Sequence, residues 1–240
     1  MSNVAVIFAG GTGQRMNSKT KPKQFLELHG KPILVYTIEH FQRHKDIDGI
    51  VLVILESWID YCNELVEKFR LTKVRAVIAG GDTGQASICN GIKKAAELFG
   101  EDSIVLIHDG VRPLIDEATI SADIECAKKN GNAITVTSAI ETVSLTDDDG
   151  KICDIFERSK CCMARAPQCF VLKDIIAAHE KAAAEGNKQF IDSASMMRYY
   201  GHELYTVPGA IENIKITTPS DYYIFRAIVD AREDSQIFGL

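Results

Sequence analysis

A glycine-rich turn followed by basic residues offers the first chemistry in this sequence. Three glycines, Gly10, Gly11 and Gly13, fall within four positions directly after an apolar run. A backbone without Cβ atoms can approach a phosphate chain closely, and its unpaired N–H groups can point at phosphate oxygens. Arg15 and Lys23 follow and can supply the positive charge that a triphosphate requires. We therefore expect a nucleoside triphosphate to bind at this turn. The contacting residues expected here are Phe8, Ala9, Gly10, Gly11, Thr12 and Gly13.

This turn differs from two common nucleotide-binding motifs. Residues 11–16 begin like the dinucleotide fingerprint, but Met16 stands where the last glycine would allow close helix packing. The Gly-Lys-Ser/Thr ending of a P-loop is also missing. What remains is a looser glycine turn, followed by Lys23 directly after Pro22, whose fixed φ restrains the start of the lysine stem. We interpret Arg15 and Lys23 as catalytic cations and the other lysines of the segment as solvated.

A second glycine-rich turn, at residues 80–87, also follows an apolar run and precedes a helical pattern. In a parallel sheet both turns fall at the carboxyl ends of strands, on the edge where ligands bind. Gly80, Gly81 and Asp82, with the Ser87 hydroxyl, are therefore candidates for contacting the base of the nucleotide. The alternative is that Ser87 only caps its helix, and both interpretations can hold.

A third polar turn, HDGVRP at 108–113, again follows an apolar run. Asp109 at a strand end could bind a ribose or a hydrated cation, and Arg112 could fix it. A structural Asp–Arg pair is the alternative. His108 is interpreted as a structural imidazole, because no Ser or Cys nucleophile pattern accompanies it. Asp109 is thus the candidate metal ligand, although a triphosphate would hold most of the ion's coordination.

Two further cations stand in apolar or special surroundings. Arg158 follows a predicted hairpin, and Lys215 lies between two isoleucines. A second anionic substrate would need such groups, and we expect Lys215 to be a strand residue aimed at a pocket. The acidic run at residues 147–149 could imitate a metal site, but a polar turn of this kind usually faces solvent.

Apolar, β-rich runs alternate with helical patterns through the first half of the chain, which predicts a mostly parallel sheet with helices on both faces. The predicted strands are residues 4–8, 49–55, 74–78, 104–108 and 133–136. The predicted helices are residues 32–41, 58–69, 87–99 and 116–130, with Ser57 and Asp116 as start signals. The expected fold class is α/β, Rossmann-like and doubly wound, with its sheet in roughly the first 140 residues. Later extended segments are residues 168–172 and 203–207, and later helices are residues 173–184, 194–200 and 219–231.

The pattern changes after residue 140. Residues 141–145 and 152–156 predict two short strands joined by an acidic turn. We expect one domain, residues 1–240, with a protruding β-hairpin arm at about 139–165. The exposed edges and apolar side chains of such an arm need a partner, so a homodimer that exchanges arms is one interpretation. A hairpin packed on its own subunit is the other.

The composition excludes several classes of protein. A chain of 240 residues with 46% hydrophobic residues can bury a full core. The net charge of −6 and the scattered lysines argue against a nucleic-acid partner or a membrane surface. The sequence has neither an apolar run that could cross a bilayer nor a signal-peptide pattern, so we expect a cytoplasmic protein. The seven cysteines lack C-x-x-C spacing and are interpreted as reduced and mostly buried.

These motifs, in this order, resemble the cytidylyltransferases that couple CTP to an alditol phosphate. That family includes the methylerythritol phosphate and ribitol-5-phosphate cytidylyltransferases, and the resemblance covers nearly the whole chain. It is carried by AGGTGQRM at 9–16, PKQFLEL at 22–28, the glycine pair at 80–81 with Ser87, HDGVRP at 108–113, APQCF at 166–170 and NIKITTPSD at 213–221.

The resemblance implies roles for Arg15 and Lys23 at the triphosphate and for Arg158 and Lys215 at the acceptor phosphate. It also implies a homodimer in which an arm helps to complete the neighbouring site, and a divalent ion, usually Mg²⁺. The acceptor-binding residues expected on this basis are Arg112, Thr142, Arg158, Asp192 and Lys215.

The chain departs from the family pattern at several positions. Gly84 replaces an arginine, Ala166 replaces the threonine of Thr-Pro-Gln, and Ile191 replaces the threonine that precedes Asp192 in the methylerythritol branch. Val111 and the six-residue spacer between Met16 and Lys23 are closer to the ribitol phosphate branch.

We therefore predict a cytidylyltransferase that condenses CTP with D-ribitol 5-phosphate to CDP-ribitol, a precursor of cell-wall or capsule polymers, and pyrophosphate. One alternative acceptor is 2-C-methyl-D-erythritol 4-phosphate, used in isoprenoid synthesis. A nucleotide-sugar glycosyltransferase is a further alternative that rests on residues 147–149. A non-catalytic CTP-binding protein is another, and Gly84 is the main argument for it.

Overall fold

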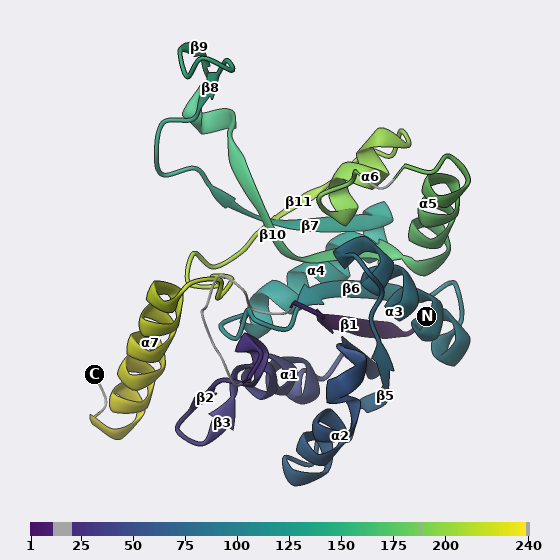
Figure 1. Cartoon of the computed structure of the whole chain (residues 1–240), viewed down its shortest axis with the longest axis vertical. Coiled ribbons are helices and arrows are strands. Elements are labelled where there is room, and N and C mark those ends of the chain that lie inside the picture. The colour runs from purple at the N-terminus through teal and green to yellow at the C-terminus, as the bar shows by residue number, and fades with distance from the viewer. Residues whose placement is uncertain (12–20, 188, 239–240) are drawn as a thin grey trace.

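The computed structural model describes residues 1–11, 21–187 and 189–238. Its centre is a seven-stranded sheet in the order β11-β7-β10-β6-β1-β4-β5 (Figure 1). The strands are β1 (Asn3–Ala9), β4 (Gly49–Ile54), β5 (Val74–Ala79), β6 (Ile104–Asp109), β7 (Asn132–Ser138), β10 (Cys162–Val171) and β11 (Thr206–Pro208). Neighbouring strands are parallel, except that β10 runs antiparallel to both β6 and β7. The predicted mostly parallel α/β sheet is confirmed.

Strand β1 lies inside the sheet, and its side chains show how the core is divided. Successive side chains of a strand point to opposite faces. Ala5 and Ile7 pack on one face, and Val4 and Val6 pack on the other. The first face is covered by α1 (Ile33–Arg43), α2 (Ile59–Lys68) and α4 (Glu117–Asn130). The second is covered by α3 (Gly84–Phe99), α5 (Leu172–Ala184) and α6 (Ser193–Tyr199). Full burial of each such valine or isoleucine stabilises the fold by roughly 1.5–3 kcal/mol, so the apolar runs require helices on both faces.

Side-chain caps set the starts of α3 and α4, and two predicted start signals are wrong. Asp116 caps α4 as predicted, accepting a hydrogen bond from a backbone N–H at 2.7 Å. Helix α3 begins at Gly84 because Thr83 Oγ1 accepts a hydrogen bond from a first-turn N–H at 3.0 Å. Ser87 therefore lies within the first turn of α3 and does not cap it. Ser57 does not cap α2 either, because it lies in a 3-10 turn that precedes that helix.

The sheet extends beyond the first 140 residues, so that part of the prediction is wrong. Strand β10 inserts between β6 and β7, and β11 pairs with the other edge of β7. Only the end of β10, near residues 168–172, was expected to be extended. Its register shifts between Ala164 and Gln168, around the cis Ala166–Pro167 bond. A proline cannot donate a ladder hydrogen bond, so its presence argues against a strand inside a sheet.

The C-terminal helix packs on a small hairpin that the sequence did not reveal. The hairpin consists of β2 (Glu27–Leu28) and β3 (Lys31–Pro32), and α7 (Pro219–Phe238) lies beside it in Figure 1. Phe225 and Val229 of α7 share an apolar cluster with Leu28 and Ile33. Within the described part of the chain, no helix is both long enough and apolar enough to cross a membrane.

The predicted arm is a thin extension that leaves the sheet at the ends of β7 and β10 (Figure 1). It carries β8 (Ser144–Thr146) and β9 (Ile152–Ile155), which pair with each other. Apolar side chains of the arm are exposed, and Ile152 is 62% accessible. In the described residues the hairpin therefore does not pack on the body of its own subunit.

The seven cysteines are all free in the structure. Of the seven, Cys62 and Cys169 are buried, whereas Cys153 and Cys162, both on the arm, are exposed. The expectation that most of these thiols are buried is therefore wrong.

Candidate active site

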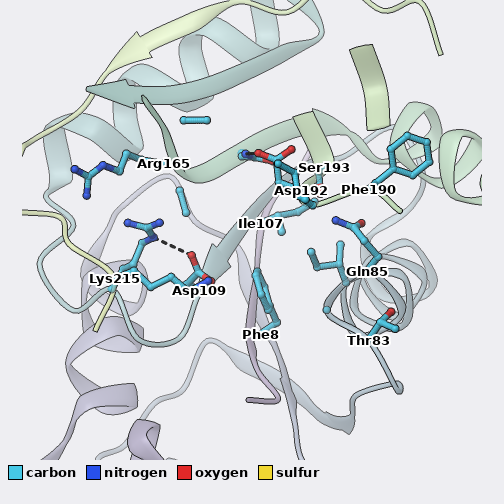
Figure 2. A pocket seen from close by; sticks show the side chains of 17 residues that line it. Phe8, Thr83, Gln85, Ile107, Asp109, Arg165, Phe190, Asp192, Ser193 and Lys215 are labelled. Carbon is cyan, nitrogen blue, oxygen red and sulfur yellow. Dashed lines mark hydrogen bonds and ion pairs between the residues drawn. The ribbon is translucent and has the colours of Figure 1, made fainter. Parts of the chain in front are cut away.

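A cavity of about 320 Å³ opens at the carboxyl ends of β1 and β6 (Figure 2). The first half of β10 and the N-terminal turns of α3 and α6 complete its wall. Its size falls in the range of small-molecule sites, roughly 300–1,000 Å³. Parallel topology predicted that the turns after neighbouring strands would meet at this edge, and the cavity lies there.

Asp109, Arg112 and Lys215 line this cavity and form an ion-pair network in which Asp109 and Arg112 are buried and Lys215 is exposed. Asp109 Oδ2 accepts a hydrogen bond from Arg112 Nε at 2.8 Å, and Asp109 Oδ1 lies 2.6 Å from Lys215 Nζ. Asp109 is only 6% accessible. Burial opposes its ionisation, but Lys215 and Arg112 together hold the pKa of the carboxyl below its ordinary value. The network therefore keeps one carboxylate charged between two cations.

The backbone around residues 213–216 brings Lys215 to this network. The Ile216 N–H donates to the Val111 carbonyl at 2.9 Å, and Arg112 Nη1 donates to the Asn213 carbonyl at 3.0 Å. Asn213 in turn donates its side-chain amide to the Ala166 carbonyl at 2.9 Å. Lys215 has no regular secondary structure, so the expectation of a strand is wrong, but its position in the cavity agrees with the predicted one.

The predicted triphosphate turn begins at the cavity and then leaves the described residues. Phe8 lines the cavity, and the Ala9 carbonyl accepts a hydrogen bond from the Gln24 side chain at 2.6 Å. Lys23 Nζ donates to the Ile216 carbonyl at 2.9 Å, one residue from Lys215. Of the other predicted residues, Gly10 and Gly11 are described, whereas Thr12, Gly13 and Arg15 lie outside the described residues.

Packing against Ser87 explains the glycine at position 80 in the second glycine-rich turn. Ser87 Oγ accepts from the Gly81 N–H at 3.1 Å and donates to the Thr83 carbonyl at 3.0 Å. A Cβ on Gly80 would lie 2.7 Å from Ser87 Oγ, so the turn needs a glycine there to fit around the serine. The cavity is lined instead by Thr83 and the two residues that follow it. Asp82 is exposed, and base contacts by this turn stay a prediction.

The predicted acceptor residues divide into two groups. Arg112, Asp192 and Lys215 line the cavity. Arg158 and Thr142 lie on the exposed arm, and Arg158 Nη1 makes a long hydrogen bond of 3.4 Å to a backbone carbonyl of the arm. The structure therefore does not bring these two residues into the cavity of their own chain.

Several residues of the cavity were not singled out from the sequence. Gln168 Nε2 donates to Asp192 Oδ2 at 2.9 Å, and Gln168 Oε1 accepts from the Ala194 N–H at 2.9 Å. Gln168 thus fixes Asp192 at the start of α6. Arg165 also lines the cavity, from the half of β10 that was not recognised as a strand. The available signal was a polar or charged residue on either side of Ala166-Pro167, which is unusual for a buried strand.

The carboxylates of the cavity are already engaged. Both oxygens of Asp109 contact cations, and Asp192 accepts from Gln168 and, at 2.8 Å, from the Ser195 N–H that it caps. These are the carboxylates among the described lining residues. Mg²⁺ prefers oxygen ligands in near-octahedral geometry, which this arrangement does not offer. The arrangement of these carboxylates therefore does not support direct coordination of Mg²⁺ by Asp109.

A sheet of this topology, with a glycine turn and a cation-lined cavity at the carboxyl ends of its strands, defines a nucleotide-binding α/β protein. Comparison with known proteins gives the particular family. Residues 3–231 match the family model described as IspD, 2-C-methyl-D-erythritol 4-phosphate cytidylyltransferase, and the chain belongs to this family.

Its relatives fall into two groups by name. The chain is 52% identical over 240 residues, with 100% of both chains covered, to the ribitol-5-phosphate cytidylyltransferase of Streptococcus agalactiae serotype V. It is 40% identical to the 2-C-methyl-D-erythritol 4-phosphate cytidylyltransferase of Clostridium acetobutylicum, covering 92% of this chain and 94% of that one. Its structure is similar to that of 4-diphosphocytidyl-2C-methyl-D-erythritol synthase from Anaerococcus prevotii, with a TM-score of 0.83, 30% identity and coverage of 95% and 96%.

Proposed function

We propose that this protein condenses CTP with D-ribitol 5-phosphate, forming CDP-ribitol and releasing pyrophosphate. The observation that carries the choice of acceptor is the similarity along the whole chain. Identity is 52% to the relative named for ribitol 5-phosphate and 40% to the one named for methylerythritol phosphate. Because CTP is a cytoplasmic metabolite, we place the reaction in the cytoplasm.

The charges of the cavity support a reaction between two anions. Arg112, Arg165 and Lys215 all line it, against the carboxylates of Asp109 and Asp192. CTP and an alditol phosphate repel each other, and fixed cations between them favour their approach. Arginine forks in particular match the oxygen geometry of phosphates.

In the proposed reaction an oxygen of the acceptor phosphate attacks the α-phosphorus of CTP, and pyrophosphate leaves. A phosphate monoester has a second pKa of about 6, so it is mostly dianionic at neutral pH and needs no general base. This agrees with the absence of a nucleophile–base pattern in the sequence. The residues then act by alignment and by stabilising charge, with Arg15 and Lys23 on the triphosphate and Lys215 on the acceptor. We treat Mg²⁺ as part of the CTP substrate, held by its phosphate oxygens.

The surface beside the acceptor end also favours ribitol 5-phosphate. Ile191 lines the cavity and is 92% accessible, next to Asp192. In the methylerythritol branch of the family, a threonine typically occupies the position of Ile191. An isoleucine has no hydroxyl to donate to an acceptor, so that hydrogen bond is not available in this chain.

We further propose a homodimer in which the arm of one subunit supplies Arg158 and Thr142 to the cavity of the other. Two features support it: the apolar side chains of the arm are exposed, and both residues lie outside the cavity of their own chain. Exposed apolar strands of this kind usually mark an interaction site.

Co-expression of two inactive variants tests this arrangement. Arg158→Ala removes the cation that the arm is proposed to supply, and Lys215→Met removes a cation of the cavity. A mixed dimer then keeps one cavity with an intact Lys215 and an intact Arg158 from its partner. Random pairing should restore roughly a quarter of wild-type activity, because half of the dimers are mixed and each has one complete site. Activity no greater than the average of the two single variants would contradict exchange of arms.

Pyrophosphate release tests the reaction itself. The purified protein is given CTP or UTP with ribitol 5-phosphate, methylerythritol 4-phosphate or glycerol 3-phosphate. We expect the highest kcat/KM for CTP with ribitol 5-phosphate. A preference for methylerythritol 4-phosphate would establish the alternative acceptor. Glycosyl transfer from a nucleotide sugar without pyrophosphate release, or CTP binding without turnover of any acceptor, would overturn the transferase proposal.

A further inference from the structure

Arg165 is a half-buried arginine in the cavity wall that the proposed reaction does not yet assign to either substrate. Its Nε donates to Thr137 Oγ1 at 3.3 Å, and its Nη1 donates to the Asn213 carbonyl at 3.4 Å. Both partners are uncharged oxygens, and both hydrogen bonds are longer than the usual 2.7–3.2 Å or so. They place the guanidinium at the base of the arm, where β7 and β10 pair.

The charge of Arg165 is not balanced by an acid. Among the residues that the structure describes, none places a carboxylate at ion-pair distance from this guanidinium. Its charged neighbour is Arg112, and burial, followed by the Arg112 charge, lowers the pKa of Arg165. Arginine stays protonated in proteins nonetheless. Two like charges held side by side oppose one another in the free protein and favour an anion that contacts both.

The position of Arg165 separates it from the nucleotide end of the cavity. Figure 2 shows Arg165 beyond Asp109, on the side opposite Phe8 and Gln85. Phe8 precedes the glycine turn, and Gln85 stands in the first turn of α3, so that side is the one we assign to CTP. Arg112 donates to the same Asn213 carbonyl as Arg165, so both arginines lie away from the end that we assign to CTP.

We propose that Arg165 binds the phosphate group of the acceptor, together with Arg112 of the same subunit. This inference rests on the proposed cytidylyltransferase function and adds a residue from the cavity's own chain to the arm residue Arg158. A phosphate offers three oxygens, and a guanidinium can bind two of them side by side. The long hydrogen bonds to Thr137 and Asn213 keep the fork in place before the substrate arrives, which lowers the cost of ordering it.

Steady-state kinetics of Arg165→Gln and Arg165→Lys test the assignment. Loss of a charge-assisted contact should raise the KM for the acceptor about 10- to 100-fold in Arg165→Gln. The KM for CTP should stay within about twofold of wild type, because the contact is made at the other end of the cavity. The acceptor KM of Arg165→Lys should fall between those of wild type and Arg165→Gln, because lysine keeps the positive charge but lacks the two-pronged guanidinium. The matched control is Arg75→Gln, an exposed arginine on the edge strand β5.

A binding measurement separates this inference from the identity of the acceptor. The cavity is first filled at the nucleotide end with α,β-methylene CTP, and inorganic phosphate is then titrated by calorimetry. Wild type and Arg75→Gln should bind phosphate, and Arg165→Gln should bind it at least about tenfold more weakly. If wild type turns over no acceptor but shows this difference, the proposed reaction fails and the Arg165 site stands.

Three results would overturn the assignment. The first is unchanged acceptor KM and unchanged phosphate affinity in Arg165→Gln. The second is an equal rise of both KM values, which would place Arg165 on CTP. The third is a folded Arg165→Lys variant as impaired as Arg165→Gln in every measurement, including thermal unfolding, which would indicate a structural role.

Discussion

Replacing Asp123 by asparagine should stabilise the protein at pH 8 and change it little near pH 4. Asp123 lies on α4 and is fully buried. Its Oδ2 accepts from Thr135 Oγ1 at 2.7 Å, and its Oδ1 has no hydrogen-bond partner among the described residues. Burial raises the pKa of this carboxyl from 3.8 to about 7, against the effect of the Thr135 hydrogen bond. The native state therefore keeps a proton that the unfolded chain loses.

The sign and size of the effect follow from linkage. Because the folded-state pKa is the higher one, the stabilisation from this proton is complete below about pH 3.8 and is lost as the pH rises through 7. Between pH 5 and pH 8 the loss amounts to about 3 kcal/mol. That is a large part of a total stability of roughly 5–15 kcal/mol. Asparagine cannot ionise, and its carbonyl oxygen can still accept from Thr135, so the variant avoids this loss.

Urea unfolding followed by circular dichroism at pH 5, 6, 7 and 8 measures the effect. The free energy of unfolding of Asp123→Asn minus that of wild type should grow by about 3 kcal/mol over this range, at constant m-value. Other titrating groups cancel in this difference. Glu125→Gln, an exposed change on the same helix, is the control and should give a flat difference. Parallel pH profiles for wild type and Asp123→Asn would refute the raised pKa and the argument from burial.

Three further variants address the site and the core. Lys23→Ala should lower kcat by about 100-fold or more, because it removes a cation from the transition state. Near-normal turnover in a folded variant would contradict that role. Lys215→Met should lower kcat/KM for the acceptor by about 100-fold, since it also leaves Asp109 with one cation fewer. The exposed Lys173→Met is its control and should be fully active. Burial lowers the pKa of His179 from 6.5 to about 4. Because the folded-state pKa is the lower one, the contribution of the neutral ring to the free energy of unfolding is complete above pH 6.5 and is lost as the pH falls toward 4. His179→Gln should therefore gain about 2 kcal/mol relative to wild type between pH 7 and pH 5 in urea unfolding, and a constant difference would exclude this titration.

The fold was predictable where hydrophobic runs are continuous. Strands such as β6 are buried on both faces, so the sequence shows an unbroken apolar run with a polar residue at its end. Strand β10 has no such signature. It carries Arg165, Pro167 and Gln168, because it lines the cavity and leads into the arm. The sequence there serves the site, so it departs from the pattern of an ordinary sheet strand.

Residues of the candidate site were predictable where polar or charged side chains lie at the end of a predicted strand. Asp109 is the last residue of β6 and Arg112 lies in the turn after it, and parallel topology was enough to place them at the carboxyl edge of the sheet, where the cavity lies. The glycines at 80–81 illustrate the limit of such reasoning. A glycine pair after a strand suggests contact with a ligand, but the space beside Gly80 is taken by the Ser87 side chain and the space beside Gly81 by Ala86. Sequence shows that a Cβ is missing, and only packing shows which group occupies the space.

Residues 213–216 contact cations that we assign to both substrates of the proposed reaction. The Ile216 carbonyl accepts from Lys23, which we assign to the triphosphate, and the Asn213 carbonyl accepts from Arg112 and Arg165, which we assign to the acceptor. Lys215 between them pairs with Asp109. In the proposed reaction this segment therefore fixes the relative positions of cations assigned to both substrates, and a reaction that joins two anions in line depends on such alignment.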